Sequence, residues 1–293
     1  MSTFLDVVKR VIESSLPTSN AIVAKVIHVV YDTSSSAKDV ADVIEHDPTL
    51  TANVLKVANS AYYGTAANIV SIQRAVVILG FNSLKELVMT ISTVHFFQTE
   101  DIYEINDLKD LWYHSIGTAK ACKFISERMS IERPEIAYLV GLLHDIGKII
   151  LFLYFPEHYR AAVQLAAEKN TRIILAERKI MNTDHASIGG LLCELWALPE
   201  SLKMPIMHHH DPAVIQGEGQ RLARIVELGD YLCRKARIGF AGDEAEVQPS
   251  PAAMALLGTG PDSVKQNYEM IIEKLRESET EIYNFFQKLE LRF

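Results

Sequence analysis

A short apolar stretch carries three side chains that could do chemistry together. Residues 141–151 read GLLHDIGKIIL, in which His144, Asp145 and Lys148 interrupt an otherwise apolar run. If this segment is helical, spacings of three and four residues put the three side chains on one face. A carboxylate buried there must be protonated, paired with Lys148 or bound to a cation, because an isolated buried charge is costly. A salt bridge alone is therefore the simplest alternative to a reactive site.

Other histidine and aspartate side chains also fall among apolar neighbours. Asp230 accompanies the helical apolar stripe of RLARIVELGDYLC and is predicted to face inward. His185 lies four residues before Gly189, where a small residue would let another helix come close, and His114 lies within LWYHSIGTAKAC. Three consecutive histidines occupy 208–210. A single such histidine is usually a hydrogen-bonded core residue, but the collection favours a shared metal.

The chemistry of this set is that of a transition-metal centre. Histidine and aspartate without cysteine favour Fe, Mn, Ni or Zn over a thiolate site. Two such ions bridged by an aspartate commonly activate water against a phosphate ester. Lys148 would then lie where it could neutralise a phosphoryl oxygen. The predicted cofactor is therefore a divalent transition metal, as one ion or two.

The elements that must position these side chains are predicted to be helical. No stretch shows sustained two-residue alternation, whereas apolar residues recur at steps of three and four. Cap signals mark helix boundaries at the serines of SSAKD (35–39), at Asp47-Pro48, at Ser71 and at Gly80. Further helices are expected at 82–97, 107–129, 135–143, 145–154, 157–169, 172–182, 184–196, 200–209 and 219–236. The predicted fold class is all-α.

The C-terminal part of the chain has a different composition. Residues 239–262 are rich in Gly, Pro and small or acidic residues, which predicts a mobile connection. The following stretch to residue 293 repeats large apolar residues at helical spacing, which predicts a long amphipathic helix. That helix either docks on the rest of the chain or contacts a second copy or another protein.

Composition and charge exclude several classes of protein. The net charge of −8 over 293 residues, with no Lys or Arg cluster, argues against a nucleic-acid partner. The N-terminus lacks the apolar segment of a signal peptide. The window IAYLVGLLHDIGKIILFLYF is long enough to span a membrane, but its three polar residues favour a buried helix pair. The sequence therefore predicts a cytoplasmic protein without a membrane partner. Three widely spaced cysteines are predicted to be small core residues in a reducing compartment: Cys122, Cys193 and Cys233.

Several motifs, taken in order along the chain, resemble the HD superfamily and more closely its HDOD branch, an HD-related output domain of bacterial signalling proteins. They are Leu16-Pro17, DVADVIEHDPTLTANVLKVANSAYYG (39–64), SIQRAVVILG (71–80), LWYHS (111–115), GLLHDIGK (141–148) and LPESLKMPIMHHHDP (198–212). The resemblance covers about residues 14–235. It implies an N-terminal helical subdomain (1–105) packed on an HD-like helical core (106–238), to which the composition of the C-terminal part adds a linker and C-terminal helix (239–293).

The resemblance also implies a ligand set, because the matching positions bind metal in the sibling HD-GYP phosphodiesterases. Those positions are His114, His144, Asp145, His185, His209, His210 and Asp230. Lys148 matches the active-site lysine of the same enzymes, whereas their Gly-Tyr-Pro signature is absent here. Asp110 stands near the place of an extra carboxylate ligand or is a solvated helix-start acid. His208 replaces His209 as the ligand if the helix is shifted by one residue.

A few remaining polar residues are assigned structural roles. Asn59 and Ser60, in the ANSAYYG stretch, are expected to form a polar helix end that binds backbone groups of the neighbouring subdomain, with contact to a ligand as the alternative. The other histidines have no place in the motifs and are expected to be surface or core residues: His28, His46, His95 and His158.

Two functions of different classes follow. Members of the HDOD family usually act as regulatory or output modules, so the resemblance implies binding to a signalling protein, with a nucleotide as a candidate ligand and a homodimer as a candidate assembly. Retention of the ligand set favours the alternative, a di-metal phosphohydrolase with Asp145 and Lys148 as catalytic residues. A metal oxygenase of the wider superfamily is a third reading. Turnover of phosphodiesters with metal present would separate the first two.

Overall fold

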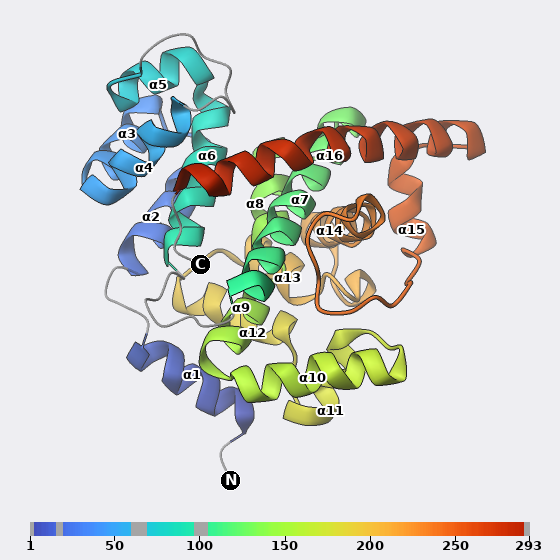
Figure 1. The fold of residues 1–293 in the computed structure, drawn as a ribbon. Coiled ribbons are helices and arrows are strands. Elements are labelled where there is room, and N and C mark those ends of the chain that lie inside the picture. The colour runs from blue at the N-terminus through green and yellow to red at the C-terminus, as the bar shows by residue number, and fades with distance from the viewer. Residues whose placement is uncertain (1–2, 16–19, 60–68, 97–104, 290–293) are drawn as a thin grey trace. The chain divides into compact units, whose positions relative to one another are not determined.

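The computed structural model describes residues 3–15, 20–59, 69–96 and 105–289. All regular elements in these ranges are helices (Figure 1), which confirms the predicted all-α class. The chain groups into two compact units. The larger unit contains residues 1–17 and 102–277, and the smaller contains 18–101 and 278–292. The predicted boundaries divide the chain differently, because residues 1–17 fall in the larger unit and residues 278–292 fall in the smaller one. The division into domains at 1–105, 106–238 and 239–293 therefore remains a prediction.

The smaller unit is a set of short helices whose starts are fixed by polar caps. Ser36 forms a capping box with Asp39, Asp47 accepts a hydrogen bond from the backbone amide of Leu50, and Ser71 caps the helix that follows it. These caps lie where the sequence predicts them. The helices are α2 (Asn20–Tyr31), α3 (Ala37–Glu45), α4 (Pro48–Ala58), α5 (Ile72–Leu79), α6 (Phe81–Phe96) and the last part of α16 (Pro261–Leu289).

Asn59, which ends α4, has the structural role that the sequence predicts, but within its own unit. Its side-chain amide donates to the carbonyls of Leu55 and Ile69, and its side-chain oxygen accepts from the backbone amide of Ile69. The polar helix end therefore holds the chain where it enters α5. Ser60 lies outside the described residues.

The larger unit is built around α7, α8 and α14, which pack against one another (Figure 1). Helices α9 to α13 follow α8 in the chain and complete the core, and α1 packs on α12. The elements are α1 (Phe4–Ser15), α7 (Ile105–Met129), α8 (Pro134–Leu143), α9 (Ile146–Tyr154), α10 (Pro156–Lys169), α11 (Ile173–Met181), α12 (His185–Leu195), α13 (Glu200–Met207), α14 (Gly217–Ala236), α15 (Pro251–Met254) and α16 as far as Glu277.

The long apolar window forms two helices of this core. Residues Pro134–Tyr154 are long and apolar enough to cross a membrane, but 89% of the most apolar window is buried inside the structure. The window is divided between α8 and α9 by a turn at His144 and Asp145. The three cysteines are also buried, as predicted, and burial raises the pKa of Cys193 to about 12. None of these thiols is therefore placed to react as a thiolate.

The segment after α14 differs from the prediction of a mobile connection. Residues 239–249, which we call the strap, run back over the larger unit and hydrogen-bond to several of its helices. Its backbone begins at Gly239, with a φ of 64°, where a Cβ would collide with the carbonyl oxygen of Asp110 and the amide of His114. The composition of the strap reflects tight turns, because only glycine fits such a close approach at positive φ.

The amphipathic helix α16 docks on the larger unit along its first part. Asn267 accepts a hydrogen bond from Arg128 (3.1 Å) and donates to the carbonyl of Leu257 (2.6 Å). Ile271 and Leu275 are fully buried on the same helix. This arrangement supports the docking alternative for residues up to Glu277, where the larger unit ends.

Candidate metal centre

The turn between α8 and α9 presents the carboxylate of Asp145 to the interior. Asp145 is the N-cap residue of α9, yet its side chain makes no capping hydrogen bond. Its Oδ2 instead accepts a hydrogen bond from Lys148 Nζ at 2.6 Å, and both side chains are almost fully buried. The predicted salt bridge is therefore present, but it uses only one of the two carboxylate oxygens.

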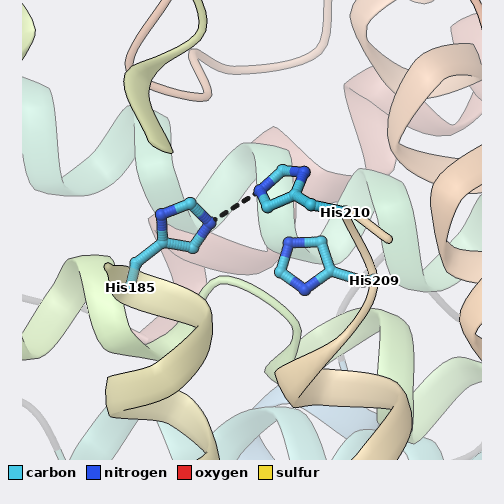
Figure 2. Close-up of side chains that lie close together, drawn as sticks. All are labelled: His185, His209 and His210. Atoms are coloured by element: carbon cyan, nitrogen blue, oxygen red, sulfur yellow. Dashed lines mark hydrogen bonds between the residues drawn. The ribbon is translucent and has the colours of Figure 1, made fainter. Parts of the chain in front are cut away.

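Histidines lie against both oxygens of Asp145. On the side of Oδ1, which we call the Oδ1 face, His185 Nε2 lies 3.3 Å away and His209 Nε2 lies 3.8 Å away. His210 completes this face, with its Nε2 2.9 Å from His185 Nε2. Figure 2 shows the three rings turned toward one another, His185 from the start of α12 and the other two from the turn after α13.

The Oδ2 face holds the remaining predicted ligands. His144 Nε2 lies 3.2 Å and His114 Nε2 lies 3.7 Å from Asp145 Oδ2. Asp230, on α14, approaches His114 Nε2 with its Oδ1 at 2.9 Å and accepts a hydrogen bond from Arg234 Nε at 2.9 Å. Burial opposes ionisation of Asp230, but the charges of Arg234 and His114 keep its pKa well below the usual range. The six other sequence-predicted ligands therefore gather around Asp145, either directly or against a histidine that lies beside it.

Three of the histidines are oriented by an acceptor behind the ring. His144 Nδ1 lies 2.7 Å from the carbonyl oxygen of Gly141, and His209 Nδ1 lies 2.7 Å from that of Ile206. A carbonyl can only accept, so Nδ1 carries the proton in both rings. In the neutral imidazole this leaves a lone pair on Nε2, which is the nitrogen that points at Asp145. The rings are thus set in the tautomer that binds a metal.

Glu177, on α11, orients the third ring and was missed by sequence reasoning. Its Oε2 accepts from both the backbone amide (2.9 Å) and Nδ1 (2.6 Å) of His185, and its side chain is completely buried. A carboxylate behind a histidine is a common support for a metal ligand. The signal in the sequence was an acid among Ile173, Ile174, Ala176 and Met181, which is the same kind of signal that Asp145 gives.

Several polar atoms at the centre of this arrangement have no hydrogen-bond partner in the part of the chain that is described: His144 Nε2, Asp145 Oδ1 and His209 Nε2. Buried polar atoms without partners are rare in native proteins. Burial and the nearby His144 lower the pKa of His209 to about 3, so its ring is neutral. Burial alone would raise the pKa of Asp145, but the neighbouring His144 and Lys148 hold it well below its usual range.

These atoms form groups of the kind that hold a divalent cation. Ligand atoms lie within 4.8 Å of one another in three overlapping sets: His185, His209 and His210; His114, His144 and Asp230; and His144, Asp145 and His209. Neutral imidazoles and ionised carboxylates are the forms that bind borderline transition metals. The donor set, the tautomers of His144, His185 and His209, and the unpartnered atoms therefore fit a metal centre.

The residues that were held as alternatives do not join these sets among the described residues. Asp110 contributes its backbone carbonyl to the amide of Phe240. His208 ends α13 one residue before the pair that faces Asp145. His28, His46 and His158 are exposed, as expected, and the side chain of His95 lies outside the described residues.

A small pocket borders the Oδ1 face and is bounded by the strap. Its volume is about 70 Å³, and its lining includes Arg172, His209, His210, Asp230, Arg234 and Asp243. Ordinary ligand pockets measure roughly 300–1,000 Å³, so the pocket has room only for small species while the strap is in place. Arg172 Nη2 donates to His210 Nδ1 at 2.7 Å, which distinguishes this ring from the three that have an acceptor behind them.

Comparison with known proteins places this chain in a family. The HDOD domain model matches residues 16–212, about two thirds of the chain. The chain therefore belongs to the HDOD domain family, as its motifs indicated. Asp230 and the strap lie beyond the matched residues.

Relatives of known sequence or structure are similar along different parts of the chain. An uncharacterized protein of Treponema pallidum (strain Nichols) is 28% identical over 182 residues, which are 59% of this chain and 33% of that protein, so the chain spans about a third of its length. An HDOD domain protein of unknown function from Geobacter sulfurreducens is 28% identical, with 97% of both chains covered and a TM-score of 0.74. A signal transduction protein from Marinobacter aquaeolei VT8, 23% identical, shares the fold with a TM-score of 0.78 over 99% of this chain and 62% of its own.

Proposed function

We propose that this chain is a regulatory module of bacterial signal transduction that binds a divalent metal and acts through a bound partner or ligand. Family membership supports the regulatory role, and a structural neighbour is named as a signal transduction protein. The observation that carries the proposal is the pairing of a preoriented metal centre with a strap that bonds Lys148. A centre built for metal but covered in this way suits a sensor or scaffold better than a rapidly turning enzyme.

The metal would be held on the two faces of Asp145. His185, His209 and His210 would serve the Oδ1 face, and His114, His144 and Asp230 the Oδ2 face, with Asp145 shared. These ligands suit Fe, Mn, Ni or Zn as one ion or two. When bound, such an ion polarises a phosphoryl oxygen and lowers the pKa of water. Glu177 and the carbonyls behind His144 and His209 would hold the rings in place.

The alternative is a phosphohydrolase acting on a nucleotide or phosphodiester, and the complete ligand set favours it. In that reaction Asp145 would position the ligands of both faces, and Lys148 would neutralise charge that develops on a phosphoryl oxygen. Lys148 Nζ donates to the carbonyl of Ala241 at 2.8 Å as well as to Asp145. The strap would have to leave before Lys148 could bind a substrate.

The proposed partner is another signalling protein in the cytoplasm, with a nucleotide as the candidate small ligand. The apolar α8–α9 pair is largely buried inside the structure, and this burial supports a location outside the membrane. The net charge of −8 supports a protein partner rather than a nucleic acid. A homodimer through the part of α16 beyond Glu277 is the assembly that we would test first by sedimentation.

A turnover assay separates the two functions. The native chain, loaded with Mn or Fe, is offered cyclic dinucleotides, mononucleotides and a generic phosphodiester, beside the Asp145→Ala variant. The regulatory proposal expects a metal-loaded chain whose background rate equals that of Asp145→Ala. Turnover by the native chain that disappears in Asp145→Ala would replace the proposal with the hydrolase.

A further inference from the structure

The strap places a carboxylate on donors that ordinarily bind an anion. Asp243 Oδ1 accepts a hydrogen bond from Arg234 Nη1 at 3.0 Å, and Asp243 Oδ2 accepts from the backbone amide of Ile173 at 2.9 Å. Ile173 is the first residue of α11, a helix of nine residues. A guanidinium and the free amide at a helix start are donors that recognise phosphate and carboxylate groups.

This donor set borders the metal centre directly. Arg234 uses its Nε to bind Asp230 of the Oδ2 face and its Nη1 to bind Asp243, so one side chain joins the two. The same pocket is lined by His209, whose Nε2 is buried without a partner among the described residues. Arg172 lines the pocket as well, so two guanidinium groups, Arg172 and Arg234, border the space beside Asp243, and guanidinium groups favour an anionic occupant.

A second contact of the strap occupies the ammonium group of Lys148. Lys148 Nζ donates at 2.8 Å to the carbonyl oxygen of Ala241, which is buried two residues before Asp243. Between them, Gly242 adopts a φ of 95°, which lets the strap direct both groups inward. The strap therefore offers a carbonyl to Lys148 and a carboxylate to Arg234, as the oxygens of a phosphate group would.

We propose that Arg234 and the first amide of α11 form a subsite for a phosphate group beside the metal centre, and that Asp243 fills this subsite as an internal ligand. The external ligand is a phosphate ion or a phosphate ester, and it binds when the strap releases Arg234 and Lys148. The inference rests on the proposed function for its link to the metal. The subsite itself needs no metal, because its donors belong to the chain.

The test changes the charge of the internal ligand and measures binding of inorganic phosphate and of adenosine monophosphate to the full chain by calorimetry. Asp243→Asn keeps the size of the side chain but removes the charge that Arg234 binds. Glu244→Gln makes the same charge change at an exposed neighbouring position of the strap and is the matched control. Each variant is measured with Mn²⁺ and after chelation, and its melting temperature is recorded.

Removal of the competing charge is expected to tighten phosphate binding about tenfold in Asp243→Asn, since a neutral amide competes less strongly than a carboxylate for the Arg234 guanidinium. Glu244→Gln should bind as the native chain does. Tighter binding of adenosine monophosphate than of inorganic phosphate would assign the subsite to an ester, and the reverse to the free ion. Equal or weaker phosphate binding by Asp243→Asn would overturn the inference.

Hydrogen exchange of the native chain provides the second readout, so that an unstable variant does not decide the outcome. Added phosphate should speed exchange of the strap amides, because the strap leaves as the ligand binds. Unchanged strap exchange at saturating phosphate would contradict the inference. If phosphate still competes with Asp243 for Arg234 in a chain that retains no metal, the subsite is supported and the proposed metal function is contradicted. If the chain retains metal but phosphate does not compete with Asp243, the metal function is supported and the subsite is contradicted.

Discussion

The two faces of Asp145 are made of the same kinds of side chain, but they are satisfied differently. On the Oδ2 face, Lys148 bonds the carboxylate and Arg234 bonds Asp230, so the protein supplies its own cations. On the Oδ1 face, Asp145 Oδ1 has no hydrogen-bond partner among the described residues, and an unpartnered imidazole nitrogen lies on each face, His209 Nε2 on the Oδ1 face and His144 Nε2 on the Oδ2 face. The comparison teaches that the two carboxylate oxygens differ, because Oδ2 is already paired with the ammonium group of Lys148 and Oδ1 is not, so the Oδ1 face has the stronger demand for an external cation. We expect it to fill first and to bind more tightly.

The largest difference in metal affinity is expected when one histidine is removed from each face in turn. His209→Ala deletes an oriented ligand from the Oδ1 face and should weaken the tighter metal site by at least about 100-fold, beyond the 10–100-fold typical of outer-shell losses. His114→Ala should affect the weaker site only. Competition with a chelator, followed by elemental analysis, measures both. Equal losses of the tighter site in the two variants would remove the distinction between the faces.

Glu177 should matter to the Oδ1 face through His185. Glu177→Gln keeps the size of the side chain but weakens the acceptor behind Nδ1, so metal affinity should fall by about 10–100-fold. Glu168→Gln is the control, since Glu168 is exposed on α10. The same chelator competition reports the effect. An affinity for Glu177→Gln that matched the Glu168→Gln control would show that Glu177 only fills space.

A smaller effect is expected from a change in the packing that brings His185 to Asp145. A Cβ at Gly147, on α9, would collide with the carbonyl oxygen of His185 at the start of α12. Gly147→Ala should therefore cost about 1–3 kcal/mol of unfolding free energy and weaken the Oδ1 face more than the Oδ2 face. Gly219→Ala is the control, because a Cβ there meets nothing closer than 3.8 Å. Denaturant unfolding of the two variants should differ accordingly.

The smallest effect is expected outside the larger unit. Asp47→Ala removes the N-cap of α4 in the smaller unit and should cost about 1 kcal/mol of stability there. Among the described residues, the grouped metal-ligating side chains all come from the larger unit. Thermal unfolding should register the loss, whereas metal content should match the native chain. A change in metal content would mean that the two faces depend on more than the larger unit.

Much of this comparison could be predicted from sequence, because its signals are local. Helical spacing and caps predicted α7 to α14 to within about two residues, and side-chain type identified the residues around Asp145. The contrast between the faces could not be predicted. It depends on which oxygen of Asp145 accepts from Lys148 and on the contact between Arg234 and Asp230, and these are decided by side-chain conformation and packing.

The strap shows the same limit more sharply. Its composition predicts a mobile connection, since glycine, proline and acidic residues are typical of loops. The roles of Ala241 and Asp243 come from contacts with residues far away in the chain, such as Lys148 and Ile173. A backbone carbonyl carries no signal in a sequence, and one aspartate among several acids is not distinguished by its neighbours.

Metal content tests the central claim most directly. The chain is purified without chelator, and bound metal is measured by elemental analysis beside Asp145→Ala, with helical content checked by circular dichroism. The account predicts about one or two ions per chain in the native protein and less than about 0.1 in the variant. A folded native chain with less than about 0.1 ion would contradict it, and the side chains around Asp145 would then be a buried polar network without a metal.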